Sequence, residues 1–214
     1  MKEPFMTVHH SSTAIYEEKK SKFIADVGYV SSEEGAAVFL DQARRKYKDA
    51  SHHTYAYSIV TGSSVQRFSD GGEPSGTAGI PILEVIKRRR FFNTMVVVTR
   101  YFGGILLGAP GLARAYGKCA AMGLDEAGHV TMTPAASASV TCSYADLGRI
   151  QSRIAQYPFK ITATHYTDGI NIEFSIPSAS IGIFTEVING LTDGKASIVI
   201  AGGDTINEER FDIF

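Results

Sequence analysis

Cysteine is scarce in this sequence, and long apolar runs are missing from it. The 214 residues contain two cysteines, Cys119 and Cys142, with neither a CxxC pair nor a second metal-type pair. We therefore expect buried, reduced thiols, no catalytic cysteine, and neither a metal nor another cofactor. No apolar run approaches the roughly 18 residues of a membrane span, and no apolar signal region follows the first Met. These absences predict a cytoplasmic protein without a membrane partner.

A large excess of one charge sign is also absent. The net charge is −1 at pH 7, whereas a protein that coats nucleic acid without specificity has a strongly basic domain. The charges are nevertheless unevenly distributed. Residues 1–130 carry 16 Lys and Arg against 13 Asp and Glu, and residues 131–214 carry 5 against 9. Any contact with RNA is therefore expected to be local and to involve the first part of the chain.

The first part of the chain has the pattern of an α+β domain. Residues 13–30 are rich in β-branched and aromatic residues, which predicts two strands or one hairpin. A helix follows to about residue 48, where Ser31 and Glu34 have the spacing of a capping box. Two further strands are then expected at 53–60 and 94–100, each followed by a glycine-rich turn and a helix. Strands first and two helices later indicate an α+β domain over residues 1–130.

A second α+β domain is predicted after a short linker. Residues 131–137 lie in a small, polar, proline-bearing stretch, which is typical of a linker. From 138 to 214 the pattern is βαββαβ, the order of a ferredoxin-like domain. The outer face of its expected strand 170–176 presents Asn171, Glu173 and Ser175. Because that face has no aromatic side chain on which a base could stack, the second domain is expected to contact protein, not RNA.

Two glycine-rich turns, in the segments 68–81 and 100–117, each lead into a helix. The first N–H groups of a helix have no backbone partner and carry a positive partial charge, so a glycine turn at that point favours a bound anion. Tight turns that merely allow close packing explain the glycines equally well. Neither segment is a P-loop or a dinucleotide-binding fingerprint, because the spacings do not fit.

Four sequence blocks resemble one known family. They are KSKFIA (20–25), HHTYAY (52–57), FSDGGEPSGTAGIP (68–81) and RYFGGILLGAPGLARAYG (100–117). In this order they are similar to the IMPACT family, specifically to its bacterial YigZ-like members. The resemblance implies a fold like domain 2 of ribosomal protein S5 for the first domain and a small additional C-terminal domain. It also implies a link to translation control, since eukaryotic members bind a partner that activates a stress kinase.

Basic and aromatic side chains interleave around the two turns. A KRRR run ends the first of the two helices, and Arg100 and Tyr101 end the strand that follows it. This interleaving is typical of contacts to RNA phosphates and bases. We therefore predict an anion- or RNA-binding surface made of Lys87, Arg88, Arg89, Arg90, Arg100, Tyr101, Gly103, Gly104, Gly111 and Arg114.

The first turn also offers groups for an enzyme. His53, Asp70, Glu73 and Arg100 would be the centre of a metal-assisted hydrolase. However, His52 and His53 are adjacent in a strand and should point to opposite faces, and carboxylates beside a helix start commonly cap it. A structural role for the turn is therefore favoured. The motif residues that either role would use are His52, His53, Asp70, Gly71, Glu73, Pro74, Gly76, Thr77 and Gly79.

The sequence thus predicts a translation-associated regulatory protein that binds RNA or a ribosome-associated complex through its first domain. It would act by occupancy, so no catalytic turnover is expected. Two alternatives stay open: the metal-assisted hydrolase, and an adaptor that contacts a protein partner without binding nucleic acid.

Overall fold

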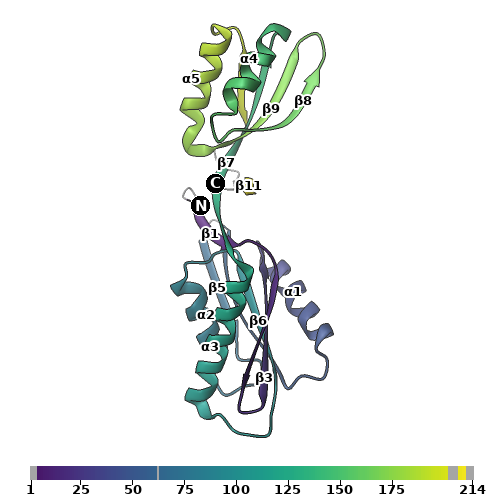
Figure 1. Cartoon of the computed structure of the whole chain (residues 1–214), viewed down its shortest axis with the longest axis vertical. Helices are drawn as coiled ribbons and strands as arrows, with labels where there is room; N and C mark the ends of the chain where they lie inside the picture. The colour runs from purple at the N-terminus through teal and green to yellow at the C-terminus, as the bar shows by residue number, and fades with distance from the viewer. Residues whose placement is uncertain (1–3, 62, 202–206, 211–214) are drawn as a thin grey trace. The chain divides into compact units, whose positions relative to one another are not determined.

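The chain forms two compact units in the computed structural model, which describes residues 4–61, 63–201 and 207–210 (Figure 1). Of residues 61, 63 and 207–210 only the backbone is described. Unit 1 contains residues 5–131 and unit 2 the residues from Met132 onward. Both units combine helices with antiparallel sheets, so the predicted α+β class is confirmed.

Unit 1 is built on a five-stranded antiparallel sheet with the order β2-β3-β6-β4-β5. The hairpin predicted at 13–30 corresponds to β2 and β3, and β6 lies at the centre of the sheet. Its residues are buried up to Arg100, as an apolar run such as MVVV requires when both faces of a strand are covered. The strands of this sheet are β2 (Ser12–Glu18), β3 (Ser21–Tyr29), β4 (His52–Thr61), β5 (Ser63–Ser69) and β6 (Thr94–Tyr101); β1 (Phe5–Val8) precedes them and is not part of it.

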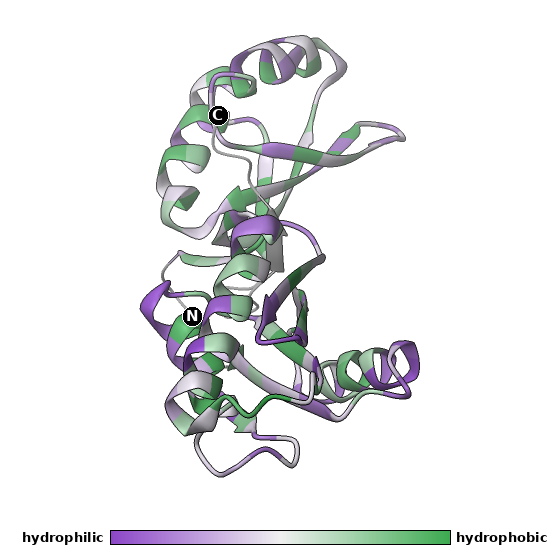
Figure 2. Cartoon of the chain, turned by 60° about the horizontal axis from the view of Figure 1, so that its bottom comes forward, coloured by the Kyte–Doolittle hydropathy of each residue, from purple (hydrophilic) through white to green (hydrophobic). Residues whose placement is uncertain are grey.

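Three helices cover the two faces of this sheet: α1 (Glu33–Lys46), α2 (Gly79–Arg88) and α3 (Gly108–Ala127). Helices α2 and α3 bury their apolar residues in one core with β3 and β6, whereas α1 packs in a separate core. Figure 2 shows hydrophobic and hydrophilic residues alternating along the helices, as burial of one side requires. None of the helices in the described residues is long and apolar enough to cross a membrane.

The residues that cap the helices can be compared with the capping residues predicted from the sequence. Helix α1 is capped by Ser32, whose hydroxyl accepts from the Gly35 N–H at 3.1 Å, so the capping residue follows the predicted Ser31 by one position. Helix α3 ends at Gly128, whose φ of +60° is the left-handed conformation that glycine adopts most easily. Strand β5 was not predicted, because its outward, mostly polar side chains give it no apolar face.

Unit 2 has the predicted ferredoxin-like order. The four strands of that pattern pair antiparallel in the order β10-β7-β9-β8, and β11 also pairs antiparallel with β7. Helices α4 and α5 pack against the sheet through Ile150, Ile154, Phe184 and Ile188. The elements are β7 (His129–Cys142), α4 (Tyr144–Ile154), β8 (Lys160–Tyr166), β9 (Ile170–Pro177), α5 (Ile181–Thr192), β10 (Ser197–Ala201) and β11 (Asn207–Arg210).

The predicted linker 131–137 is not irregular in the structure. These residues belong to β7, which begins at His129 in unit 1 and continues to Cys142 in unit 2. Ala135, Ala136 and Ser137 pair with β9, and part of the segment also pairs with β11. The small side chains that suggested a linker instead occupy positions in a paired strand, where Ala135 and Ala136 are buried.

We predict that the two units fold independently. Residues 1–131 and 132–214, expressed separately, should each unfold cooperatively in calorimetry, because each has its own hydrophobic core. The cut falls inside β7 but leaves the pairing of β7 with β9 and β10 intact. Non-cooperative melting of both fragments, beside normal melting of the whole chain, would show that the units depend on each other.

Candidate functional site: the two glycine turns

The first glycine turn encloses the carboxylate of Asp70. Oδ1 accepts from the N–H groups of Ala78 and Gly79 at 3.0 and 2.8 Å, and Oδ2 accepts from the Gly76 N–H at 2.8 Å. Burial raises the pKa of Asp70, but the three backbone donors outweigh burial and hold the pKa below its usual value. The anion at the start of α2 is therefore the protein's own side chain.

The other motif residues of this turn hold its shape. Thr77 donates its hydroxyl to the Pro74 carbonyl at 2.6 Å. Gly71 has φ of +55°, and a Cβ there would lie 2.0 Å from the carbonyl oxygen of His53. Any side chain at Gly71 would thus both strain the turn and collide with β4. The structural role that the sequence favours for this turn agrees with these contacts.

Glu73 lies in a buried cluster with Arg100 and Tyr116. Its Oε1 accepts from Arg100 Nη1 at 2.6 Å and from the Tyr116 hydroxyl at 2.7 Å. The three residues are at most 9% exposed. Burial, and then the adjacent Glu73, raise the pKa of Tyr116 far above its usual value, so its phenol remains a donor. Glu73 therefore stabilises the interior and does not cap the helix.

Arg100 joins the two turns from inside. Its guanidinium lies between the rings of Phe23 and Phe102, at 5.4 and 5.5 Å from their centroids. Its Nη2 donates to Ser21 Oγ at 3.3 Å, and the same oxygen accepts from the Gly103 N–H at 3.2 Å. Because this guanidinium is buried and paired, the prediction that Arg100 contacts an external phosphate is wrong for this structure.

His52 and His53 have different partners, as strand alternation implies. Nδ1 of His52 lies 3.1 Å from the carbonyl oxygen of Gly71, and its Nε2 lies 3.9 Å from Glu73 Oε1. Nδ1 of His53 lies 3.1 Å from the Thr99 hydroxyl. Burial, followed by the charge of Arg44, lowers the pKa of His53. The two imidazoles do not form a pair of metal ligands.

The four residues of the predicted hydrolase do not form one constellation. Asp70 is held by backbone N–H groups, His53 contacts Thr99, and Glu73 and Arg100 neutralise each other. Among the described residues, no group of three or more His, Cys, Asp or Glu side chains could hold a metal ion. Cys119 and Cys142 are both buried and unbonded, and burial raises the pKa of Cys119 to about 12. The thiol of Cys119 is therefore protonated at neutral pH.

The second glycine turn packs against the β2–β3 hairpin and leads into α3. A Cβ at Gly103 would lie 2.0 Å from the backbone of Lys20, so the turn needs glycine to approach the hairpin. Gly104 has φ of +80° with open space around it, and Gly111 lies in the first turn of α3. No side chain caps this helix. Unlike the first turn, the second has no carboxylate that accepts from the first N–H groups of its helix, and the first turn of α3 contains no acidic residue.

A cavity of about 300 Å³ lies beside the start of α3. Three cationic side chains, Lys19, Arg114 and Lys118, line it together with Glu18. The Lys118 ammonium lies 4.4 Å from the centroid of the Tyr16 ring. In the described part of the chain, none of these three cations forms an ion pair with a carboxylate. This cavity, which we call the α3 cavity, is where unit 1 presents uncompensated positive charge beside a glycine turn.

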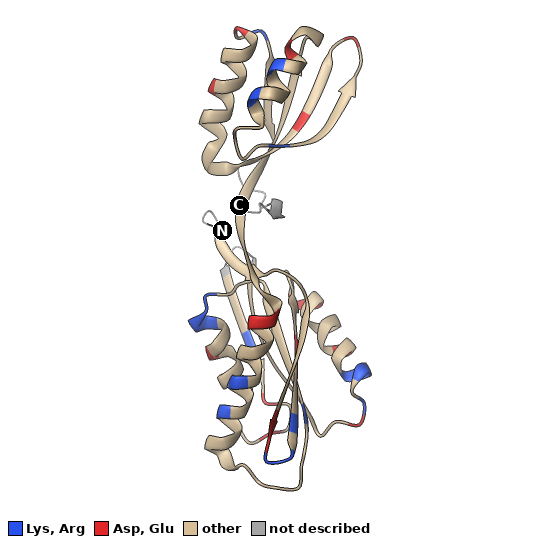
Figure 3. Ribbon diagram, viewed as in Figure 1, with Lys and Arg blue, Asp and Glu red and all other residues tan. Residues whose placement is uncertain are grey.

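The KRRR run lies at the opposite end of α2 from the first glycine turn. The helix has 10 residues, so its ends are about 15 Å apart. Lys87 pairs with Glu84 at 2.9 Å, and Arg89 pairs with Asp125 at 2.5 Å. Figure 3 shows Lys and Arg in several separate groups over unit 1. The prediction that Lys87, Arg88, Arg89 and Arg90 form one surface with Arg100 and Arg114 is therefore corrected.

The structure adds residues that the sequence did not indicate. Tyr116 and Ser21 complete the buried cluster, and Lys19 and Lys118 complete the α3 cavity. Position 118 is one helical turn after Arg114, a spacing that could have indicated Lys118. No local pattern could have indicated Lys19, because it reaches the cavity from the turn of the β2–β3 hairpin, far from Arg114 in the sequence. Tyr101 was predicted to stack on a base. In the structure its hydroxyl donates to Asp49 at 2.9 Å, so the polar end of this side chain already has a partner.

Asp70→Asn should destabilise the protein by about 1–3 kcal/mol, since it removes a charge that accepts three backbone hydrogen bonds. Thermal and denaturant unfolding measure this loss. Asp41→Asn is a matched control, because its pair with Arg45 is exposed and such pairs contribute about 0–1 kcal/mol. Equal effects of the two substitutions would contradict a capping role for Asp70.

Glu73→Gln should cost about 3–5 kcal/mol, because the buried Arg100 charge loses its compensation. The double substitution Glu73→Gln/Arg100→Met should be less destabilising than the sum of the two single substitutions, since no buried charge is then left alone. A double-mutant cycle in urea measures the coupling. Additive losses would mean that the two side chains do not stabilise each other.

Comparison with known proteins places these features in a family. Residues 19–124 match the Impact N-terminal domain, and residues 140–195 match a domain of unknown function, DUF1949. The chain is 39% identical to the IMPACT family member YvyE of Bacillus subtilis over 180 residues, which cover 84% of this chain and 83% of the relative. It is 31% identical to the IMPACT family member YigZ of Escherichia coli over 189 residues, or 87% and 93% of the two chains.

A solved structure agrees with the sequence comparison. The crystal structure of a hypothetical protein, 29% identical in sequence, superposes with a TM-score of 0.64 and covers 95% of this chain and 100% of its own. Both the family matches and the two-domain arrangement of α+β units thus agree with the resemblance of the four sequence blocks. The chain belongs to the IMPACT family.

Proposed function

We propose that this protein is a translation regulator that binds structured RNA, free or within the ribosome, through the α3 cavity of unit 1. The observation that carries the proposal is the group of three cations, Lys19, Arg114 and Lys118, that line this cavity beside the first half of α3, whose start has no side-chain cap. Membership of the IMPACT family, which is linked to translation control, supports the regulatory part. Binding itself, without turnover, would be the regulatory act.

Internal charge compensation decides which basic residues are available to a polyanion. Arg100 is neutralised by Glu73, Arg89 by Asp125 and Lys87 by Glu84. Transferring any of these cations to a phosphate would break an existing pair. Lys19, Arg114 and Lys118 have no such pair to lose, so their interaction with phosphate is less opposed. Arg88 and Arg90 also form no ion pair among the described residues, but they lie at the end of α2 that is far from the glycine turn. The proposed RNA contact therefore moves from the KRRR run to the α3 cavity, where unpaired cations and a glycine turn lie together.

The second glycine turn adds backbone donors to these cations. A phosphate at the start of α3 would meet N–H groups that lack an intrahelical partner, together with the positive end of the helix dipole. In the first turn the same positions are filled by Asp70. Of the residues first predicted, Gly103, Gly104, Gly111 and Arg114 thus remain in the proposed surface.

Removing cations from the α3 cavity should weaken RNA binding and also make the affinity depend less on salt concentration. Each lost phosphate contact lowers the slope of log affinity against log salt by about 0.7–0.9. Arg114→Gln/Lys118→Gln should therefore reduce the slope by about 1.4–1.8, with affinity falling similarly for all RNA sequences. Fluorescence anisotropy with structured RNA, and sedimentation with ribosomes, at a series of salt concentrations measure this effect.

The matched control removes two cations elsewhere. Arg88→Gln/Arg90→Gln makes the same change in net charge at the far end of α2, and its slope should stay close to that of the unaltered protein. Equal slopes in all three proteins, or no binding at low salt, would overturn the RNA proposal.

A protein partner is the second candidate, and one observation favours it. Phe102, Ile105 and Leu106 of the second glycine turn are 49%, 42% and 82% exposed. Adjacent exposed apolar side chains are common at protein-binding sites. Binding to ribosomes that survives loss of the α3 cations but disappears in Leu106→Ser would favour this adaptor function over direct RNA binding.

A further inference from the structure

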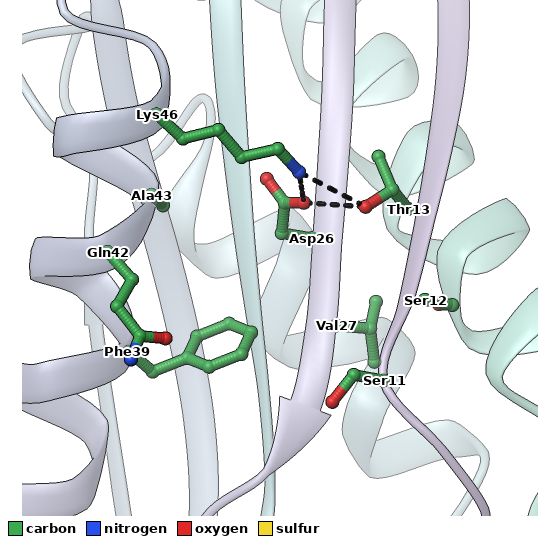
Figure 4. A pocket seen from close by; sticks show the side chains of 9 residues that line it. All are labelled: Ser11, Ser12, Thr13, Asp26, Val27, Phe39, Gln42, Ala43 and Lys46. Carbon is green, nitrogen blue, oxygen red and sulfur yellow. Dashed lines mark hydrogen bonds and ion pairs between the residues drawn. The ribbon is translucent and has the colours of Figure 1, made fainter.

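A separate cavity of about 280 Å³ lies between α1 and the β2–β3 hairpin (Figure 4). Lys46, Gln42 and Phe39 border it from the helix, and Thr13 and Asp26 from the strands. Phe39 and Ala43 of this site, which we call the α1 cavity, pack in the core under α1, whereas α2 and α3 pack in another core of unit 1. The α1 cavity contains none of the glycine-turn residues.

A buried carboxylate forms the polar wall of the α1 cavity. Asp26 is only 8% exposed. Its Oδ1 accepts from the Thr13 hydroxyl at 2.7 Å and from the Lys46 ammonium at 2.8 Å. Its Oδ2 is buried without a hydrogen-bond partner in the described structure. A buried charged oxygen left without a donor costs free energy, so this wall favours a ligand group that brings one.

The polar wall is held in place by three different elements. Thr13 comes from β2, Asp26 from β3 and Lys46 from α1, and Figure 4 shows their side chains converging on one point. Lys46 and Asp26 neutralise each other, so the cavity has polar groups but little net charge. An anion would gain no net attraction there, because Asp26 already compensates the charge of Lys46. The α1 cavity is therefore chemically opposite to the cationic α3 cavity.

The remaining wall is flat and apolar. The ring of Phe39 lies so close to the sheet that a Cβ at Gly28 would be 2.5 Å from Cε2 of that ring. Ala43 extends this surface. Beside it stands Gln42, whose amide makes no hydrogen bond to another described residue and can both donate and accept. The cavity thus combines an aromatic wall with paired donor and acceptor groups.

We infer that the α1 cavity binds an uncharged, planar heterocycle with an amide-type edge, the chemistry of a nucleobase. The ring would lie on Phe39, and its edge would exchange hydrogen bonds with Gln42 and donate toward Asp26. The volume of about 280 Å³ is just below the roughly 300–1,000 Å³ of small-molecule sites, which suits one ring system. Among the described residues that line the cavity, Lys46 is the one cation that a phosphate on the ligand could meet, and it is already paired with Asp26.

An NMR titration of the isotope-labelled whole protein with adenosine, cytidine and uridine tests the inference. At least one nucleoside should shift the amide signals around Phe39, Gln42 and Thr13 in a saturable manner, with a dissociation constant of about 1 mM or lower, as expected for so small a ligand. Gln42→Ala should weaken this binding by about tenfold, which corresponds to loss of one or two hydrogen bonds. Phe39→Leu should weaken it similarly while keeping an apolar side chain.

Two controls keep the result interpretable. Val38→Ala changes an exposed residue of the same helix, 59% accessible, and should leave the affinity unchanged. Inorganic phosphate alone should not shift the same signals, because Asp26 disfavours anions. No saturable shift with any nucleoside, an unaltered affinity in both Gln42→Ala and Phe39→Leu, or equal shifts with phosphate would each overturn the inference. None of these outcomes bears on RNA binding at the α3 cavity, which the salt titration tests separately.

Discussion

The buried ion pair between Glu73 and Arg100 links the parts of unit 1 that surround the glycine turns. Glu73 belongs to the first turn and Arg100 to the central strand, while Tyr116 brings α3 to the same carboxylate. Through Ser21 the arginine also reaches the hairpin on which the second turn rests. A buried charge cannot lose its partner without a large free-energy cost, so this pair fixes the two turns relative to each other.

Such internal pairing also decides which charged side chains are used within the protein and which are available to a ligand. Both carboxylates of the first turn are used internally: Asp70 by backbone N–H groups and Glu73 by Arg100. The first turn is thus an anion site that the protein fills itself. At the second turn the helix start has no such carboxylate, and Lys19, Arg114 and Lys118 line the cavity beside the first half of the helix. The same kind of glycine turn therefore has a structural role in one case and suits a ligand in the other.

Unit 1 offers a second kind of chemistry at the α1 cavity. There the charges of Asp26 and Lys46 cancel, and an aromatic wall faces polar groups. The α3 cavity favours phosphate, whereas the α1 cavity disfavours it. Under our two proposals, unit 1 would bind a macromolecule at one of these sites and a small molecule at the other.

Local sequence patterns determined most of the fold. The hairpin of β2 and β3, the central strand with its MVVV run, and the order βαββαβ in unit 2 all follow from residue periodicity, because burial of apolar side chains dictates it. The four sequence blocks indicated the family. The segment 131–137 was predicted as a linker but belongs to strand β7, because small residues are compatible with a linker and with a paired strand. Strand β5 gave no signal, because an edge strand needs no apolar face.

Local sequence patterns predicted only part of the candidate site. The sequence placed anion chemistry at the glycine turns, and it favoured a structural role for Asp70. It could not show that Arg100 is buried against Glu73, that the KRRR run lies at the far end of α2, or that Lys19 and Lys118 meet beside α3. These facts depend on which charges the folded chain brings within reach of each other. The sequence by itself determined which elements form, through local periodicity, whereas only the tertiary structure decided which cations are neutralised, because charge pairing acts between residues far apart in the chain.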